Sequence, residues 1–327
     1  MKQKIAIAFL LALGAGAAKA DNVPEPCKNH FILDLPCGRD VPARGTLAFV
    51  SERDGNSEIY VVNVDGTGLQ RLTNDPALDV EPAWSPDGKR IAFASDRAGS
   101  WDIYVMDADG SNLVRRTEGG SSFSPAWSED GKQVAFSSLR DGEYGIYVMN
   151  LDGDWAHPER VGFEMGWNGH PAWSPGGERI AFVSDWRAFD FVYDLYVMEA
   201  DGSAVTRLLA GPLPGPPWTY YFQPAWSPDG AKIAVVACEY ARDNCYPSSS
   251  IAIAKADGSG LKPLVKTSGY ARPTWSPDGG TIAFASQACR ACVPELRYVT
   301  ADGGRSGVIL SNGHHPAWRP LAKPSPP

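Results

Sequence analysis

The sequence lacks any dense run of basic residues. Its 327 residues include 30 Lys and Arg against 38 Asp and Glu, which gives a formal net charge of −8. Binding to the phosphates of nucleic acid, or to anionic lipid surfaces, requires clustered Lys and Arg side chains. The composition therefore argues against a nucleic-acid partner and against a charge-driven membrane association.

Long hydrophobic runs are also absent. Beyond the apolar residues 5–13, no stretch approaches the 18 consecutive apolar residues that a membrane-spanning helix needs. That short run follows two lysines and precedes an Ala-Lys-Ala motif at residues 18–20, a pattern typical of a cleavable signal peptide. We therefore expect residues 1–20 to be a signal peptide. The mature chain, starting at Asp21, is expected to be periplasmic or secreted, without membrane insertion.

Cysteine is scarce, with six residues in the chain. They fall into three local pairs: Cys27 and Cys37, Cys238 and Cys245, and Cys289 and Cys292. In an exported chain, an even number of paired cysteines favours disulfides. The last pair has the C-x-x-C spacing of a metal site, but a structural zinc site needs a second such pair. We predict disulfides and leave their connectivity open.

The nucleophile motif G-x-S-x-G is missing as well. Serine hydrolases of the α/β type place their catalytic serine in that motif, on a strand-to-helix turn. The sequence therefore favours a binding protein over an enzyme, and we expect no cofactor.

What the chain does contain is a repeat. The segment PAWSPDG at residues 82–88 recurs five more times with small changes, the last copy being shortened. The spacings between the six tryptophans of these copies are 43, 46, 53, 49 and 43 residues. Repeats of this length indicate a solenoid, a propeller or another array of similar units. The tryptophans, which recur at one place in every unit, are expected to pack between units.

Each repeat predicts four short strands. In the best-preserved copy these are residues 82–84, 90–95, 102–106 and 113–117. Ser-Pro-Asp-Gly supplies the first tight turn, and an Asp-Gly pair ends strand three. Four antiparallel strands at this spacing are typical of a propeller blade. The predicted fold is an all-β, six-bladed β-propeller.

The two ends of the array predict how the ring closes. The first unit opens at strand two, residues 47–50, and the last PAW segment, residues 316–318, has no strands after it. We expect this C-terminal strand to complete the N-terminal blade, because closure leaves no unpaired sheet edge between the ends. The propeller would then span residues 46–320. An extension, residues 21–45, holds the first cysteine pair, and residues 321–327 form a disordered tail.

Residues 82–117, PAWSPDGKRIAFASDRAGSWDIYVMDADGSNLVRRT, resemble the WD-repeat-like unit of the TolB family, the periplasmic propellers of the Tol–Pal envelope system. The resemblance covers about residues 46–320 and implies a six-bladed propeller that binds other proteins. Residues 21–45 offer no counterpart to that family's N-terminal α/β domain, so the family's role in Tol–Pal is not transferred. The same unit builds propeller domains of prolyl-oligopeptidase-type enzymes, whose hydrolase domain has no match in this sequence.

Strand parity divides the connections between two faces of the ring. The Ser-Pro-Asp-Gly and Asp-Gly turns share one face and are short. The other face, here called the loop face, carries the long variable connections at residues 183–194, 210–223, 236–250 and 285–295. Binding residues gather on loops held by a rigid scaffold, so we expect recognition there. The aromatic candidates are Trp186, Trp218, Tyr220, Tyr221 and Phe222, which could alternatively fold back as a small core.

One further position varies from blade to blade, the residue before each PAW segment. We call these six residues the central ring: Glu81, Ser124, His170, Gln223, Arg272 and His315. They are expected to begin the innermost strands and to line one mouth of the channel. Glu81, His170 and His315 could ligate a divalent metal, although solvated polar residues would fit the same place.

Three functional hypotheses follow. The leading one is an exported, monomeric scaffold that binds an envelope or secreted protein or peptide through the loop face. The second is a lyase or lactonase acting on a sugar acid or lactone with a metal in the channel. The third is a carbohydrate-binding module in which Trp218 and Tyr221 stack on sugar rings.

Overall fold

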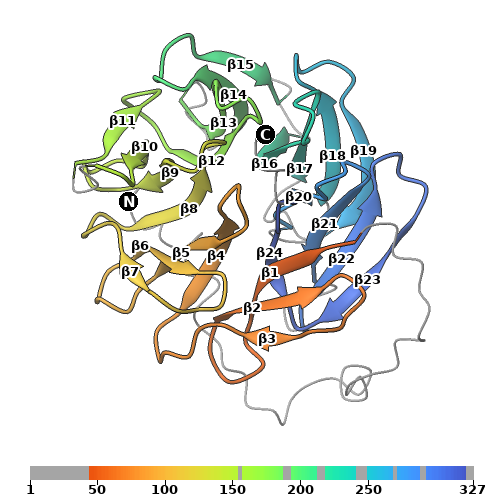
Figure 1. Ribbon diagram of the computed structural model, residues 1–327. Helices are drawn as coiled ribbons and strands as arrows, with labels where there is room; N and C mark the ends of the chain where they lie inside the picture. The colour runs from red at the N-terminus through yellow and green to blue at the C-terminus, as the bar shows by residue number, and fades with distance from the viewer. Residues whose placement is uncertain are drawn as a thin grey trace, which may run out of the picture.

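Six four-stranded antiparallel sheets form a ring in the computed structural model (Figure 1). The structure describes residues 44–153, 157–186, 193–211, 218–240, 249–267, 271–287 and 292–321. Within these ranges there are strands, turns and bends, and no helix. The all-β, six-bladed propeller predicted from the repeat is therefore confirmed.

The first three blades have nearly uniform strands. Blade 1 comprises β1 (Thr46–Ser51), β2 (Glu58–Asn63) and β3 (Gln70–Arg71), together with β24 (His314–Trp318). Blade 2 comprises β4 (Asp79–Trp84), β5 (Arg90–Ser95), β6 (Asp102–Asp107) and β7 (Val114–Arg115). Blade 3 comprises β8 (Ser122–Trp127), β9 (Gln133–Ser138), β10 (Gly145–Asn150) and β11 (Glu159–Val161).

The last three blades depart from this regularity. Blade 4 comprises β12 (Asn168–Trp173), β13 (Arg179–Ser184), β14 (Asp194–Glu199) and β15 (Thr206–Leu209). Blade 5 has two nine-residue strands, β16 (Trp218–Trp226) and β17 (Lys232–Tyr240), followed by β18 (Ser249–Lys255) and β19 (Lys262–Thr267). Blade 6 comprises β20 (Thr274–Trp275), β21 (Thr281–Ser286), β22 (Glu295–Thr300) and β23 (Ser306–Ser311).

The second strand of each blade is apolar without alternation, and its position in the blade explains this pattern. In blade 2, β5 lies between β4 and β6, and its residues 91–95 are all buried. A blade packs against a neighbouring blade on each of its two faces, so side chains pointing either way leave water. A strand buried on both faces is expected to be a nearly continuous hydrophobic run, such as Ile-Ala-Phe-Ala here.

The Ser-Pro-Asp-Gly turn is held by its own side chains. Ser85 Oγ donates to Asp87 Oδ1 at 2.6 Å, and the backbone N–H of Lys89 donates to the same oxygen at 3.0 Å. Gly88 has a φ of +66°, which a residue with a Cβ adopts only at a cost. Because the turn is specified locally, it recurs with the same Ser and Asp bonds at Ser128, Ser227 and Ser276.

The repeated tryptophans join neighbouring blades, as predicted. The indole Nε1 of Trp127 donates to the carbonyl of Ala83 in the preceding blade at 3.0 Å. Trp275 makes the same bond to Ala225 at 3.0 Å. The guanidinium of Arg90 also lies 4.7 Å from the Trp127 ring, from the preceding blade. These side chains therefore serve packing rather than chemistry.

The ring closes through strand β24, as the sequence predicted. β24 pairs antiparallel with β1, matching Trp318 with Leu47, and lies beside it in Figure 1. Arg319 continues the closure: its Nε donates to the Gly88 carbonyl at 3.0 Å, and its guanidinium lies 4.9 Å from the Trp84 ring. The two ends of the array thus share blade 1 and lock it onto blade 2.

Replacing the closing tryptophan should destabilise the protein strongly. Trp318→Ala removes a buried indole from the only blade built from both ends of the array, and we expect a loss of about 3–5 kcal/mol in the free energy of unfolding. Urea unfolding followed by circular dichroism measures it. Trp186→Ala, at a more exposed tryptophan, serves as the control and should cost less than about 1 kcal/mol. Equal losses would contradict the role given to closure.

The Asp-Gly turns predict a response to acid. Bonds from the hydroxyls of Thr67, Ser111, Ser203 and Ser259 lower the pKa of Asp65, Asp109, Asp201 and Asp257. A folded carboxyl with a lowered pKa stabilises the fold above its unfolded pKa, and that stability is lost as pH falls below the ordinary value of 3.8.

A variant with these four hydroxyl residues replaced by Ala should be less stable at pH 7. It should also lose less stability than the unchanged protein between pH 4 and pH 2, because its aspartate pKa values return toward normal. Urea unfolding across that pH range measures both effects, with Ser306→Ala as the control. A parallel pH dependence in the two proteins would refute the explanation.

Candidate functional site

Five of the six central-ring residues lie inside an innermost strand rather than at its start, and Arg272 lies two residues before β20. Glu81 is the third residue of β4, Ser124 the third of β8 and His170 the third of β12. Glu81, Ser124, Gln223 and His315 are buried rather than exposed at a mouth. In β4, β8 and β12 two strand residues precede the ring position, so the ring residue lies further along the strand than predicted.

All six ring residues share an unusual backbone. Their φ angles lie between 42° and 59°, the left-handed region, at the point where the first strand shifts register against the second. Such a conformation costs on the order of 1 kcal/mol for a residue other than glycine. Because every blade carries it at the same position, the strain belongs to the architecture and does not single out a reactive residue.

Glu81 is the centre of the polar contacts in the ring. Its Oε2 accepts the backbone N–H of Ser124 at 2.5 Å and the Ser124 hydroxyl at 3.0 Å. Its Oε1 lies 3.0 Å from Nη1 of Arg272, which comes from blade 6. The backbone N–H of Arg272 in turn donates to Gln223 Oε1 at 2.9 Å. Side chains from blades 2, 3, 5 and 6 are thus joined across the middle of the ring.

The histidines of this region are neutral at pH 7. Burial lowers the pKa of His170 to about 4, with Glu81 opposing and Arg272 adding to the shift. Burial lowers the pKa of His314 to about 4 as well. His315 has a pKa well below its ordinary value through burial, with His314 and Arg272 contributing. The Nδ1 atoms of all three are buried and have no hydrogen-bond partner in the described part of the chain.

The predicted metal ligands do not form a metal centre here. Among the described residues, no group of three or more His, Cys, Asp or Glu side chains could hold a metal ion. Glu81 instead accepts bonds from Ser124 and faces Arg272, whose positive charge opposes a cation. The structure therefore gives no support to the metal hypothesis for Glu81, His170 and His315.

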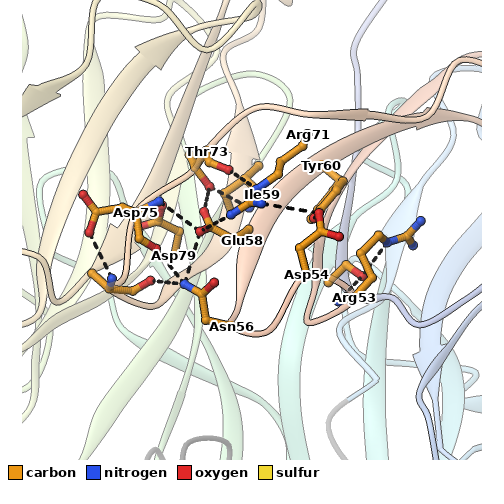
Figure 2. Close-up of polar contacts among 12 residues, drawn as sticks. Arg53, Asp54, Asn56, Glu58, Ile59, Tyr60, Arg71, Thr73, Asp75 and Asp79 are labelled. Atoms are coloured by element: carbon orange, nitrogen blue, oxygen red, sulfur yellow. Dashed lines mark hydrogen bonds and ion pairs between the residues drawn. The ribbon is translucent and has the colours of Figure 1, made fainter.

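A second polar cluster, which the sequence analysis missed, lies where blade 1 meets blade 2 (Figure 2). The fully buried carboxylate of Glu58 accepts Nη2 of Arg71 at 2.7 Å, the Thr73 hydroxyl at 2.5 Å and the backbone N–H of Asp75 at 3.0 Å. Blade 2 repeats the arrangement around Asp102. The sequence does carry a signal for this cluster: an acidic residue begins strand three, and an Arg-x-Thr motif lies near strand four. Its recurrence marks it as structural.

The loop-face ends of blades 1 to 3 carry a common arginine clamp. In blade 2, Arg97 lies 5.7 Å from the Phe93 ring and 5.1 Å from the Tyr104 ring, and its Nη2 is 2.7 Å from Asp79 Oδ2. Arg53 and Arg140 occupy the same place over a Phe and a Tyr. Each arginine follows a serine of strand two by two residues. Its guanidinium covers the aromatic pair with a polar group.

Blade 4 replaces this arginine with Trp186. The indole stacks on Phe163 with ring centroids 4.5 Å apart and an interplanar angle of 11°. Trp186 remains 42% exposed, and the neighbouring Met165 is 66% exposed. Gly166 lies close to the Trp186 backbone, so the segment that carries Met165 runs beside Trp186. We call Phe163, Met165 and Trp186 the aromatic platform. Of the five predicted binding aromatics, Trp186 is thus found on the surface.

Three aromatics of blade 5 follow the alternative given for them, a place in the core rather than on the binding surface. Tyr220, Tyr221 and Phe222 belong to β16, and their exposed fractions are only 7%, 4% and 6%. Tyr221 pairs with Ala237 of β17, so the expected loop is an extension of both strands. These three residues form part of the core, and Tyr221 cannot stack on a sugar as proposed. Trp218 also belongs to β16, but its side chain lies outside what the structure describes.

Two of the six cysteines can be placed. Cys238 and Cys292 are both disulfide-bonded. Cys238 lies in β17 rather than in the connection that follows it. Cys27, Cys37, Cys245 and Cys289 lie outside the described residues, so the three predicted pairings stay predictions. In the described ranges no helix has the length and apolar character needed to cross a membrane.

The family comparison matches most of the chain. The model described as "TolB beta propeller domain" matches residues 40–124 and 117–322. The "Tol-Pal system protein TolB" of Geobacter sulfurreducens is 38% identical over 60 residues, covering 18% of this chain and 14% of that protein. This chain therefore aligns with only a small part of the length of the curated relatives.

The solved structures extend the likeness in fold. TolB from Acinetobacter baumannii has a TM-score of 0.70 at 24% identity, over 85% of this chain and 67% of its own. A putative TolB from Agrobacterium tumefaciens has a TM-score of 0.63 at 21% identity, over 84% and 92% of the two chains. At these identities the structures support the propeller fold alone.

Neutralising the buried carboxylate of the ring should destabilise the protein. Glu81→Gln keeps acceptor oxygen for Ser124 but leaves Arg272 without its counter-charge, and we expect a loss of about 3 kcal/mol in the free energy of unfolding. Glu295→Gln is a matched control, because Arg297 lies at the same 3.0 Å but both side chains are more exposed. It should cost less than about 1 kcal/mol. Urea unfolding measures the free energy of unfolding of both variants, and similar losses of stability in the two would contradict the prediction.

Proposed function

Because this chain belongs to the TolB beta-propeller domain family, we propose that it is a scaffold that binds another protein. The relatives are named as proteins of the Tol-Pal system, which supports a partner of the cell envelope. The signal peptide expected at residues 1–20 supports a periplasmic or secreted location. Membership of a Tol-Pal assembly is not part of the proposal, because the aligned share of those relatives is small.

The observation that carries the proposal is the aromatic platform. A polar clamp closes this position in blades 1 to 3, whereas blade 4 exposes Trp186 on top of Phe163. Trp supplies large contact area at low entropic cost and dominates many protein interfaces. A partially exposed indole whose ring is already fixed by stacking loses little freedom when a partner covers it.

Acidic residues surround the platform. The Glu143 carboxylate accepts the backbone N–H of Gly166 at 3.2 Å, and the Asp185 carboxylate accepts that of Trp167 at 2.7 Å. Glu164 adds a further negative charge next to Met165. An apolar centre with a charged rim is the usual arrangement of a protein interface. Arg160 also reaches this rim, where its Nη2 donates to the Glu164 carbonyl at 2.8 Å. The platform therefore fits a partner segment that offers an apolar side chain flanked by polar residues.

The rest of the loop face supports the same reading. The disulfide-bonded Cys238 lies near the end of β17, and the disulfide-bonded Cys292 lies in the connection from β21 to β22; by strand parity both are toward the same face as Trp186. Disulfides restrict the conformations of the connections that they close and so reduce the ordering cost of binding. The opposite face consists of short turns of nearly constant sequence, which offers a partner little to distinguish.

Removing the indole of Trp186 should weaken the binding of the partner protein. The full-length chain is used to capture proteins from an envelope extract, and the affinity of each purified candidate is then measured by calorimetry. Trp186→Ala should weaken binding about 30-fold or more, the loss expected of a tryptophan hot spot worth about 2 kcal/mol.

Leu113→Ala is the matched control, because Leu113 is another exposed apolar residue that follows an Asp-Gly turn on the opposite face. It should leave the affinity unchanged, and both variants should keep their melting temperature. If Trp186→Ala binds every captured protein as tightly as the unchanged chain, the aromatic platform is not the binding site.

A further inference from the structure

The central ring contains more hydrogen-bond donors than acceptors. Its one carboxylate, Glu81, already accepts two bonds from Ser124 through Oε2. The amide oxygen of Gln223 is occupied by the backbone N–H of Arg272. Oε2 of Glu81 and Oε1 of Gln223 are therefore occupied, and Oε1 of Glu81 faces Arg272.

Arg272 holds most of the unused donors. A guanidinium has five N–H groups in a planar fork. In the part of the chain that the structure describes, its side chain has one ion-pair contact, between Nη1 and Glu81 Oε1 at 3.0 Å. That contact is not aligned as a hydrogen bond, so even buried Nη1 lacks an acceptor. The ion pair with Glu81 positions Arg272, but among the described residues its N–H groups have no hydrogen-bond acceptor.

Two histidines of the ring add further unpaired polar atoms. His170 from blade 4 and His315 from blade 1 take the same backbone position as Arg272. The innermost strands of blades 1 and 6 meet where the backbone N–H of Trp318 donates to the Thr274 hydroxyl at 3.2 Å, and both histidines interact electrostatically with Arg272. Their Nδ1 atoms are buried and unpaired among the described residues. A neutral imidazole can carry its proton on either nitrogen. His170 and His315 can therefore each donate a hydrogen bond from Nδ1 to a bound acceptor.

Buried polar groups without partners are rare in native proteins and imply an occupant that supplies the missing bonds. The occupant must be small, because Glu81, Ser124, Gln223 and His315 are all buried. It must also be rich in acceptors and able to meet a planar fork of donors, as a carboxylate does. We propose that the central ring binds a carboxylate group through Arg272, with His170 and His315 as neighbouring donors.

The carboxylate has two sources with the same chemistry: a small free acid, or the C-terminal carboxylate of a peptide that enters the ring. The proposal does not depend on the aromatic platform, because Trp186 contributes nothing to the ring contacts. Loss of protein binding in Trp186→Ala would therefore leave carboxylate binding intact, and the two ideas fail independently.

The test titrates three probes into the full-length chain and follows the melting temperature and the imidazole ¹⁵N shifts. The probes are acetate, triglycine with a free C-terminus and amidated triglycine, each at constant ionic strength set with chloride. Acetate or free triglycine should raise the melting temperature saturably and shift the imidazole nitrogens, whereas the amidated peptide should do neither. A response to acetate indicates a small free acid, and a response to free triglycine alone indicates a peptide terminus.

Two substitutions of the same arginine assign the effect to the ring. Arg272→Lys keeps the charge beside Glu81 but loses the fork, and should weaken the probe about tenfold or more without unfolding the protein. Arg272→Gln should abolish the response. Arg305→Gln, at an exposed arginine, should change nothing. No saturable response in the unchanged chain, an equal response to chloride, or an undiminished response in Arg272→Lys would each overturn the proposal.

Discussion

The pairing of β24 with β1 is the constraint on which the rest of the molecule depends. Every blade buries both of its faces against neighbours, so an open array would expose an apolar face at each end. Closure removes these two faces at once, through the register of Trp318 with Leu47 and the packing of Arg319 on Trp84. Arg90 performs the corresponding stacking for blade 3, whereas blade 1 has Thr46 at that point of strand two and uses the C-terminal arginine instead.

A closed ring of similar blades also makes departures from the repeat informative. Left-handed φ angles, acidic residues opening strand three and arginine clamps recur from blade to blade, and recurrence identifies them as parts of the architecture. The arginine clamp is limited to blades 1 to 3, and in blade 4 its position is taken by Trp186. The substitution of an exposed indole for a polar clamp has no packing requirement behind it, since blades 1 to 3 cover the same place with arginine. Function is therefore more readily sought in the exceptions than in the repeats.

The middle of the ring shows how polar groups survive at a place where six strands converge. The carboxylate of Glu81 has two kinds of contact, a hydrogen bond from the backbone N–H of Ser124 and an ion pair with Arg272. The histidines respond differently: they lose their protons, which their lowered pKa values express. The unpaired polar atoms that remain are a property of the assembled ring, because its members come from different blades.

The sequence alone determined the number of blades, the turns and the closure, because each is encoded within one repeat or at the two ends of the array. Ser85, Asp87 and Gly88 specify their turn within a few residues, whatever the rest of the chain does. The tertiary structure alone decided that Tyr220, Tyr221 and Phe222 are core residues and that Glu81, Ser124 and His170 lie within their strands. It also brought Arg272 against Glu81, residues separated by four intervening PAW segments. No local pattern records such contacts, since they depend on how the blades are curved and how closely the innermost strands approach one another.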